Sequence, residues 1–134
     1  MFGFGAEKKQ SAHLAGIIFG LNQRFAQEVG VSSIGQGVKA PTYNERNLAV
    51  IFGFACAGAQ HMNASSKILE KALEMYFGNM SDGQQQLSQL SLIVEDPKYE
   101  KIIIAATQAG HEISTRNDLS SLRRLADKFV KNSF

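Results

Sequence analysis

The sequence predicts an all-α protein, a single compact bundle of five to six helices around a central apolar helix at about residues 43–62. Apolar residues recur at helical spacing along nearly the whole chain. Two capping-box patterns, Thr-x-x-Glu at Thr42 and Ser-x-x-Gln at Ser81, mark helix starts. With 134 residues, of which 44% are apolar, and a net charge of only +2, we expect one folded helical domain over residues 1–134.

The first helix is predicted from one apolar stripe that ends before Gly30. The stripe has spacings of three and four residues and consists of Leu14, Ile18, Leu21, Phe25 and Val29. Residues 1–9, rich in Gly and Phe at their beginning, are expected to form a flexible start. Residues 30–41 contain three glycines and two serines, a composition typical of a loop.

The central helix is predicted to begin at the Thr42–Glu45 capping box and to run to about Met62. From Leu48 on it is apolar on almost all sides, which indicates that other helices surround it. Small residues along it, Gly53 and Gly58 among them, are expected to let neighbouring backbones approach closely.

Two further helices follow in the predicted bundle. The third is expected from Ser65 or Ser66 to Phe77, with Gly78 as its stop. The fourth begins at the capping box formed by Ser81 and Gln84. Its core-facing residues are expected to be Leu87, Leu90 and Val94.

The last two helices have clear start signals as well. Asp96 followed by Pro97 is typical of an N-cap with a first-turn proline, and predicts the start of the fifth helix. Either Asn117 or Asp118 is expected to cap the sixth. The run Ile102–Ile104 is compatible with a strand, but its flanks keep helical spacing.

No pattern in the sequence predicts a catalytic residue, a metal ligand set or a cofactor. The three histidines, His13, His61 and His111, fall on different predicted helices and form no His-x-x-x-His or Glu-x-x-His pair. Cys56 lies within the most apolar helix, where a thiolate is disfavoured, so it is interpreted as a packing residue.

We therefore predict a protein that acts by binding another protein, as an inhibitor, an immunity-type neutraliser or an adaptor does, without catalysis of its own. The predicted binding residues are the cations near and on the last helix, Arg116, Arg124, Lys128 and Lys131, which suit an acidic partner. The simpler interpretation of these cations is a solvated face favoured by the helix dipole.

Self-association is predicted at a small-xxx-small pair, Gly16 and Gly20, together with Phe19. Each glycine in a helix interior costs up to about 1 kcal/mol relative to alanine, so close packing is expected there. A second copy of the chain gives a homodimer. The alternative is a second helix of the same domain.

Two alternative functions remain open from the sequence. One is a small-molecule-binding protein or enzyme in which the 30–41 loop closes over a ligand near Tyr43 and His61. The other is a helical nucleic-acid-binding regulator that uses the last helix, which we do not expect because no aromatic residues interleave with its cations. A single cysteine, the charge order of the first residues and the absence of an apolar run of about 20 residues predict a cytoplasmic protein without membrane contact.

Overall fold

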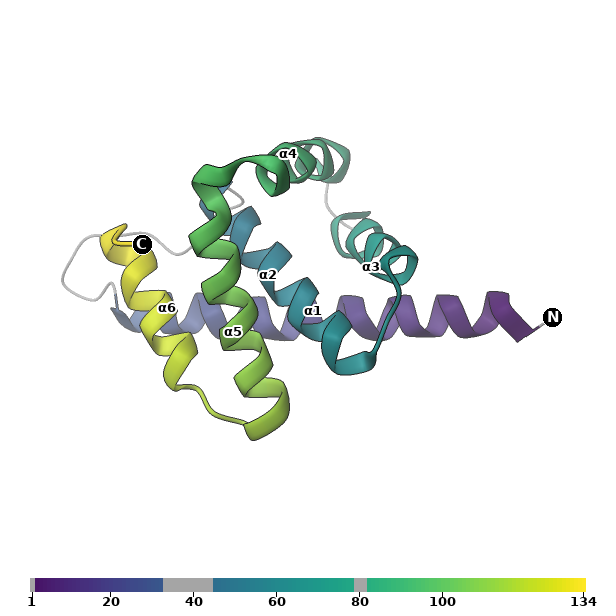
Figure 1. Cartoon of the computed structure of the whole chain (residues 1–134), viewed down its shortest axis with the longest axis horizontal. Coiled ribbons are helices and arrows are strands. Elements are labelled where there is room, and N and C mark those ends of the chain that lie inside the picture. Colours follow the sequence, from purple (N-terminus) through teal and green to yellow (C-terminus); the bar gives the residue numbers. More distant parts are fainter. Residues whose placement is uncertain (1, 33–44, 79–81) are drawn as a thin grey trace.

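The structure is a computed structural model that describes residues 2–32, 45–78 and 82–134, and only the backbone for 2–4. These residues contain six α-helices and one 3-10 turn, and no strand occurs among them (Figure 1). In chain order these are α1 (Phe2–Ser32), α2 (Glu45–Met62), α3 (Ser66–Gly78), α4 (Gly83–Glu95), η1 (Pro97–Tyr99), α5 (Glu100–Arg116) and α6 (Ser120–Lys131). The predicted all-α bundle is confirmed, and Ile102–Ile104 is helical.

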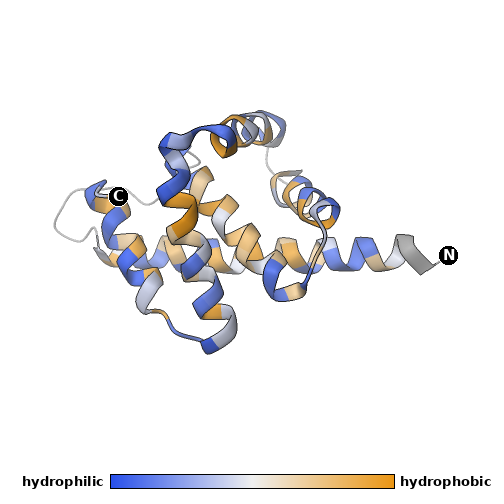
Figure 2. Ribbon diagram, in the orientation of Figure 1, coloured by the Kyte–Doolittle hydropathy of each residue, from blue (hydrophilic) through white to orange (hydrophobic). Residues whose placement is uncertain are grey.

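Helix α2 is the central element of the bundle, as its apolar sequence predicts. Eleven of its 18 residues are buried, and it contacts α1, α3, α4 and α5 (Figure 1). Helix α6 packs mainly on α1 and α5. The colouring of the ribbon in Figure 2 places most hydrophobic residues on the sides of the helices that face one another and most hydrophilic residues on the outer sides. Burial on nearly all sides explains why α2 tolerates no polar face.

The closest approach of two helices is that of α2 and α5, and two glycines make it possible. A Cβ on Gly53 would lie 2.5 Å from the Cβ of Ala106, and one on Gly110 would lie 2.8 Å from the Cβ of Ala57. Neither position therefore admits a side chain without moving the neighbouring helix. The predicted role of the small residues in α2 is confirmed here.

Aromatic contacts join α1, α2 and α6 in the core. The ring of Phe25 in α1 lies edge-on to Phe54 of α2 and to Phe129 of α6, with centroid separations of 5.9 and 5.1 Å. Such edge-to-face pairs are favoured by the charge distribution of the rings. The whole predicted stripe of α1 is buried, consisting of Leu14, Ile18, Leu21, Phe25 and Val29.

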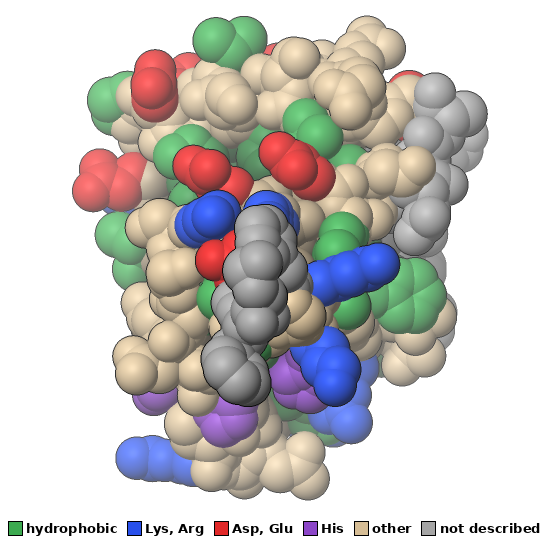
Figure 3. Space-filling view, turned by 90° about the vertical axis from the view of Figure 1, so that its right-hand side faces the viewer, with side chains coloured by type: hydrophobic (Ala, Val, Ile, Leu, Met, Phe, Trp, Pro, Cys, Tyr) green, Lys and Arg blue, Asp and Glu red, His purple; other side chains and the backbone are tan. Residues whose placement is uncertain are grey.

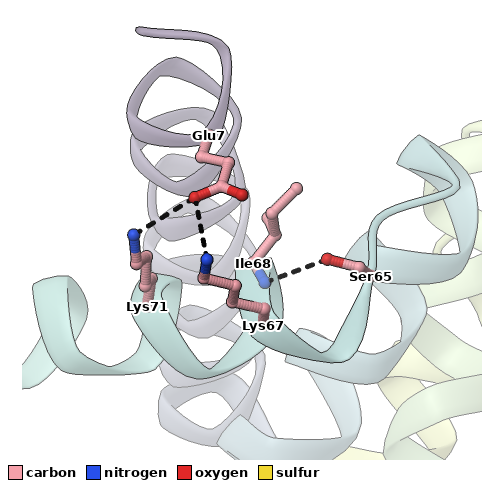
Figure 4. A network of polar contacts seen from close by, with 5 residues as sticks. All are labelled: Glu7, Ser65, Lys67, Ile68 and Lys71. Atoms are coloured by element: carbon pink, nitrogen blue, oxygen red, sulfur yellow. Dashed lines mark hydrogen bonds and ion pairs between the residues drawn. The ribbon is translucent and has the colours of Figure 1, made fainter. Parts of the chain in front are cut away.

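Helix α1 is longer at both ends than the sequence analysis predicts. It begins at Phe2, so residues 2–9 of the expected flexible start are helical, and it continues through Gly30 to Ser32. The N-terminal extension is supported by α3, because the carboxylate of Glu7 lies 3.5 and 3.4 Å from the ammonium groups of Lys67 and Lys71 (Figure 4). These two lysines, Lys71 foremost, hold the pKa of Glu7 below its usual value. The expected loop after Ser32 lies outside the described residues.

The predicted capping boxes are only partly within the described residues. Thr42 and Ser81 lie outside them. Helix α4 follows Asp82, whose carboxylate accepts a hydrogen bond from the side chain of Gln86 (2.8 Å) and none from a backbone N–H of the first turn.

The inward face of α4 also differs from the prediction. Leu90 is buried as predicted and Leu87 is half-buried, whereas Val94 is 39% exposed and Ile93 is buried in its place. The buried face of α4 therefore consists of Gly83, Gln86, Leu90 and Ile93, and is rotated relative to the predicted face.

The start signal of the fifth helix is confirmed, and that of the sixth only in part, because Leu119 directly precedes α6 and provides no side-chain cap. Asp96 accepts a hydrogen bond from the backbone N–H of Lys98 (3.0 Å), and Pro97 opens η1, as predicted. Asp118 accepts from the backbone N–H of Ser120 (2.9 Å) at the start of α6, and this bond lowers its pKa. Asn117 is not an N-cap: it ends α5 in the left-handed conformation, which asparagine adopts more readily than other residues with a Cβ.

Candidate partner-binding surfaces

The predicted cationic residues are all exposed, and we call them the basic surface: Arg116, Arg124, Lys128 and Lys131. Arg116 ends α5 and the other three lie on α6. The opposite face of α6 is buried in the core through Leu122, Leu125, Ala126 and Phe129. The core therefore fixes the helix, while its cations remain in water.

The cations of the basic surface are weakly engaged within the chain. The guanidinium of Arg124 donates to the hydroxyl of Ser121 (2.9 Å). Lys131 pairs with Asp127 at 3.1 Å, but both side chains are at least half exposed, and such pairs contribute little to stability. Among the described residues, Arg116, Arg124 and Lys128 make no ion pair. Arg124 and Arg116 nevertheless lie close enough to Asp118 to help lower its pKa.

The predicted self-association residues, Gly16, Phe19 and Gly20, lie on a face of α1 that no described helix covers; we call it the glycine surface. A Cβ at either glycine would meet nothing within 4 Å, and Phe19 is 55% exposed. Met75 and Tyr76 of α3 border this face. Within the described chain, a second helix does not pack on these glycines, which was the alternative explanation for them.

The predicted ligand residues are only partly described. Tyr43 and residues 33–41 of the expected loop lie outside the described residues. His61 is exposed in the last turn of α2. It is separated from Glu45, at the start of that helix, by roughly 24 Å along the helix axis. The structure therefore places His61 far from the point where α2 begins.

The described residues hold no group of three or more His, Cys, Asp or Glu side chains placed to bind a metal ion. His13, His61 and His111 are exposed on α1, α2 and α5. Cys56 is half-buried, and its burial raises the pKa of the thiol, which disfavours the reactive thiolate.

A cleft that the sequence did not predict lies between the start of α2, η1 and the C-terminal residues. Arg46 is half-buried there, donates to the backbone carbonyl of Phe129 and lies 4.3 Å from the centroid of its ring. The buried hydroxyl of Tyr99 donates to the carboxylate of Glu45. These contacts join α2 to α6 and η1, so their role is to hold the bundle together. A lone Arg at a helix start gives no sequence signal for such contacts.

Comparison of the chain with protein-family models, with curated proteins and with solved structures finds no match. No helix in the described part of the chain has the length and apolar character needed to span a membrane.

Proposed function

We propose that this protein acts by binding another protein through the basic surface, and that it has no catalysis of its own. The observation that carries the proposal is the exposure of four cations. Arg124, Lys128 and Lys131 lie on α6, whose other face is buried in the core, and Arg116 ends α5. An inhibitor, an immunity-type neutraliser or an adaptor needs such a rigid charged surface. Little reorganisation is then required on binding.

The charge of the surface indicates the chemistry of the partner. Exposed cations favour an acidic protein surface, to which they contribute on-rate and specificity. Exposed charges are screened beyond about 8 Å at physiological ionic strength, so binding through this surface weakens as salt rises.

The test is a triple charge reversal, Arg124→Glu with Lys128→Glu and Lys131→Glu. A matched control reverses three exposed cations of α1, Lys8, Lys9 and Arg24. Both variants change the net charge from +2 to −4, so they differ only in where the charge is changed.

Tagged wild-type protein and both variants are used to isolate partners from the native host, with and without nuclease, and affinities are then measured by calorimetry at low salt. We expect the wild type and the α1 control to retain one stoichiometric protein partner that the α6 variant loses. Equal affinity of the α6 variant contradicts the proposal, and so does a bound species that nuclease removes.

A further inference from the structure

A groove between α3 and α4 continues over the first turns of α5, on a part of the molecule that the basic surface does not include. Its first half lies between the two helices, and its second half lies beside the start of α5. The two halves share Phe52, Val94 and Glu95, so they form one continuous depression. We call it the acidic groove.

The floor of the acidic groove is apolar. It includes side chains that are half-buried or exposed in the described structure, namely Phe52, Leu69, Leu87, Val94, Ile103 and Ile104. Val94 and Ile104 are 39% and 58% exposed. Such side chains, exposed within a depression, can pack against the apolar side of a partner.

Every charged residue that lines the acidic groove is acidic. These residues are Glu70, Glu74, Glu95, Asp96 and Glu100, five of the twelve acidic residues in the chain. No Lys or Arg is among the lining residues. Figure 3 shows most acidic side chains in the upper part of one face, with hydrophobic side chains between them, and most Lys, Arg and His side chains below.

In helix α3 the lysines have an ion-pair partner within the chain, whereas the two glutamates have none among the described residues. Lys67 and Lys71, one turn apart, share the carboxylate of Glu7 (Figure 4). Glu70 and Glu74 are also one turn apart, and like charges at this spacing repel each other along a helix. Within the described residues neither glutamate has a cationic partner. A cation supplied from outside the chain relieves this repulsion.

From this geometry we infer that the acidic groove binds a cationic amphipathic helix of another protein. The apolar side of such a helix packs on the groove floor through residues at i, i+3, i+4 and i+7, and its Lys and Arg side chains reach the acidic rim. The 13 residues of α4 span roughly 20 Å, so the bound segment has three to four turns. This inference does not depend on the basic surface, because that surface suits an acidic partner and the groove suits a cationic one.

The probe is a synthetic peptide of about fourteen residues, built from Leu at amphipathic helical positions and Lys elsewhere. A second peptide has Glu in place of every Lys. We expect the lysine peptide to gain helicity with the full-length protein, to bind it in calorimetry and to shift backbone amide NMR signals of α3, α4 and the start of α5. We expect no binding of the glutamate peptide.

Two pairs of variants locate the binding. Glu74→Lys with Glu95→Lys is expected to weaken binding of the lysine peptide by about tenfold or more. Glu28→Lys with Asp127→Lys changes the net charge by the same amount outside the groove lining and is expected to leave binding unchanged. Val94→Ser with Ile104→Ser is expected to weaken it by about tenfold through lost apolar contact. Leu92→Ser, at a residue of α4 that is 72% exposed and does not line the groove, is the matched control. Circular dichroism melts check that each variant is folded.

The inference is wrong if the lysine peptide does not bind, if the glutamate peptide binds equally well, or if the control variants weaken binding as much as the groove variants. It is also wrong if the wild type is an oligomer that Val94→Ser with Ile104→Ser converts to a monomer, since a second copy of the chain then occupies the groove. The proposal for the basic surface is tested with different variants, so either one can fail alone.

Discussion

Glycines of two kinds occur in the helices of this protein, and substitution by alanine distinguishes them. At Gly53 a new Cβ would lie 2.5 Å from the Cβ of Ala106 and 2.7 Å from the carbonyl oxygen of Ile103. We predict that Gly53→Ala lowers the free energy of unfolding by about 1–3 kcal/mol, because overpacking forces α2 and α5 apart. Urea denaturation followed by circular dichroism measures this loss.

The control for that prediction is Gly5→Ala in α1, where a Cβ would meet nothing within 4 Å. Alanine has the higher helix propensity, so this variant should be as stable as the wild type or more stable. A Gly53→Ala variant as stable as Gly5→Ala contradicts the close approach of α2 and α5.

Tyr99 provides a prediction about alkaline pH. Its hydrogen bond to Glu45, together with burial, raises the pKa of the phenol from 10.0 to about 12. The folded state therefore holds the phenolic proton more tightly than the unfolded state does. The resulting stabilisation is fully present below pH 10 and is lost as the pH rises toward about 12.

We predict that Tyr99→Phe removes this part of the pH dependence. The free energy of unfolding of the wild type should fall more steeply than that of the variant from pH 10 to about pH 12. Because lysines also titrate in this range, the relevant measurement is the difference between the two proteins. Parallel curves contradict a raised pKa at Tyr99.

At the scale of single helices, most of the fold was predictable because periodicity and stop signals are local. The stripe of α1, the all-round apolar character of α2 and the Asp96–Pro97 start all appear in the structure as predicted. The predicted bounds of α1 were wrong, because contacts with another helix determine where α1 begins. The start of α1 is supported by the ion pairs of Glu7 with α3, and nothing in residues 1–9 alone indicates that partner.

The two candidate surfaces also differ in how far the sequence alone predicts them. The basic surface was predictable from sequence because three of its four residues lie on one face of one helix. The acidic groove was not, since its floor and rim come from α2, α3, α4 and α5, and only their packing brings Phe52, Glu74 and Glu100 to one depression. The exposure of Val94, predicted to be buried, is part of that groove.

At the scale of the whole molecule, the net charge of +2 conceals a separation of charge. The basic surface lies on α6 and the end of α5, and the acidic groove lies between α3, α4 and the start of α5. Figure 1 shows α6 at one side of the bundle and α3 and α4 at the other. The two proposed partners would therefore bind at separate places on the molecule.

A further prediction at this scale concerns self-association through the glycine surface. If this face of α1 meets the same face of a second chain, the contact is isologous and a two-fold dimer results. We predict that Gly20→Leu converts this dimer to a monomer that remains folded. A side chain at this position meets nothing within 4 Å in the monomer, and leucine has the higher helix propensity.

Sedimentation equilibrium over a range of concentrations, combined with thermal melts, tests this prediction. Gln85→Leu, which adds the same side chain at an exposed position of α4, controls for added surface hydrophobicity and should leave the dimer intact. A wild type that is monomeric at high concentration contradicts the dimer. Loss of the cooperative melt in Gly20→Leu shows instead that Gly20 packs inside the molecule, because only a packed position turns a better helix former into a destabilising residue.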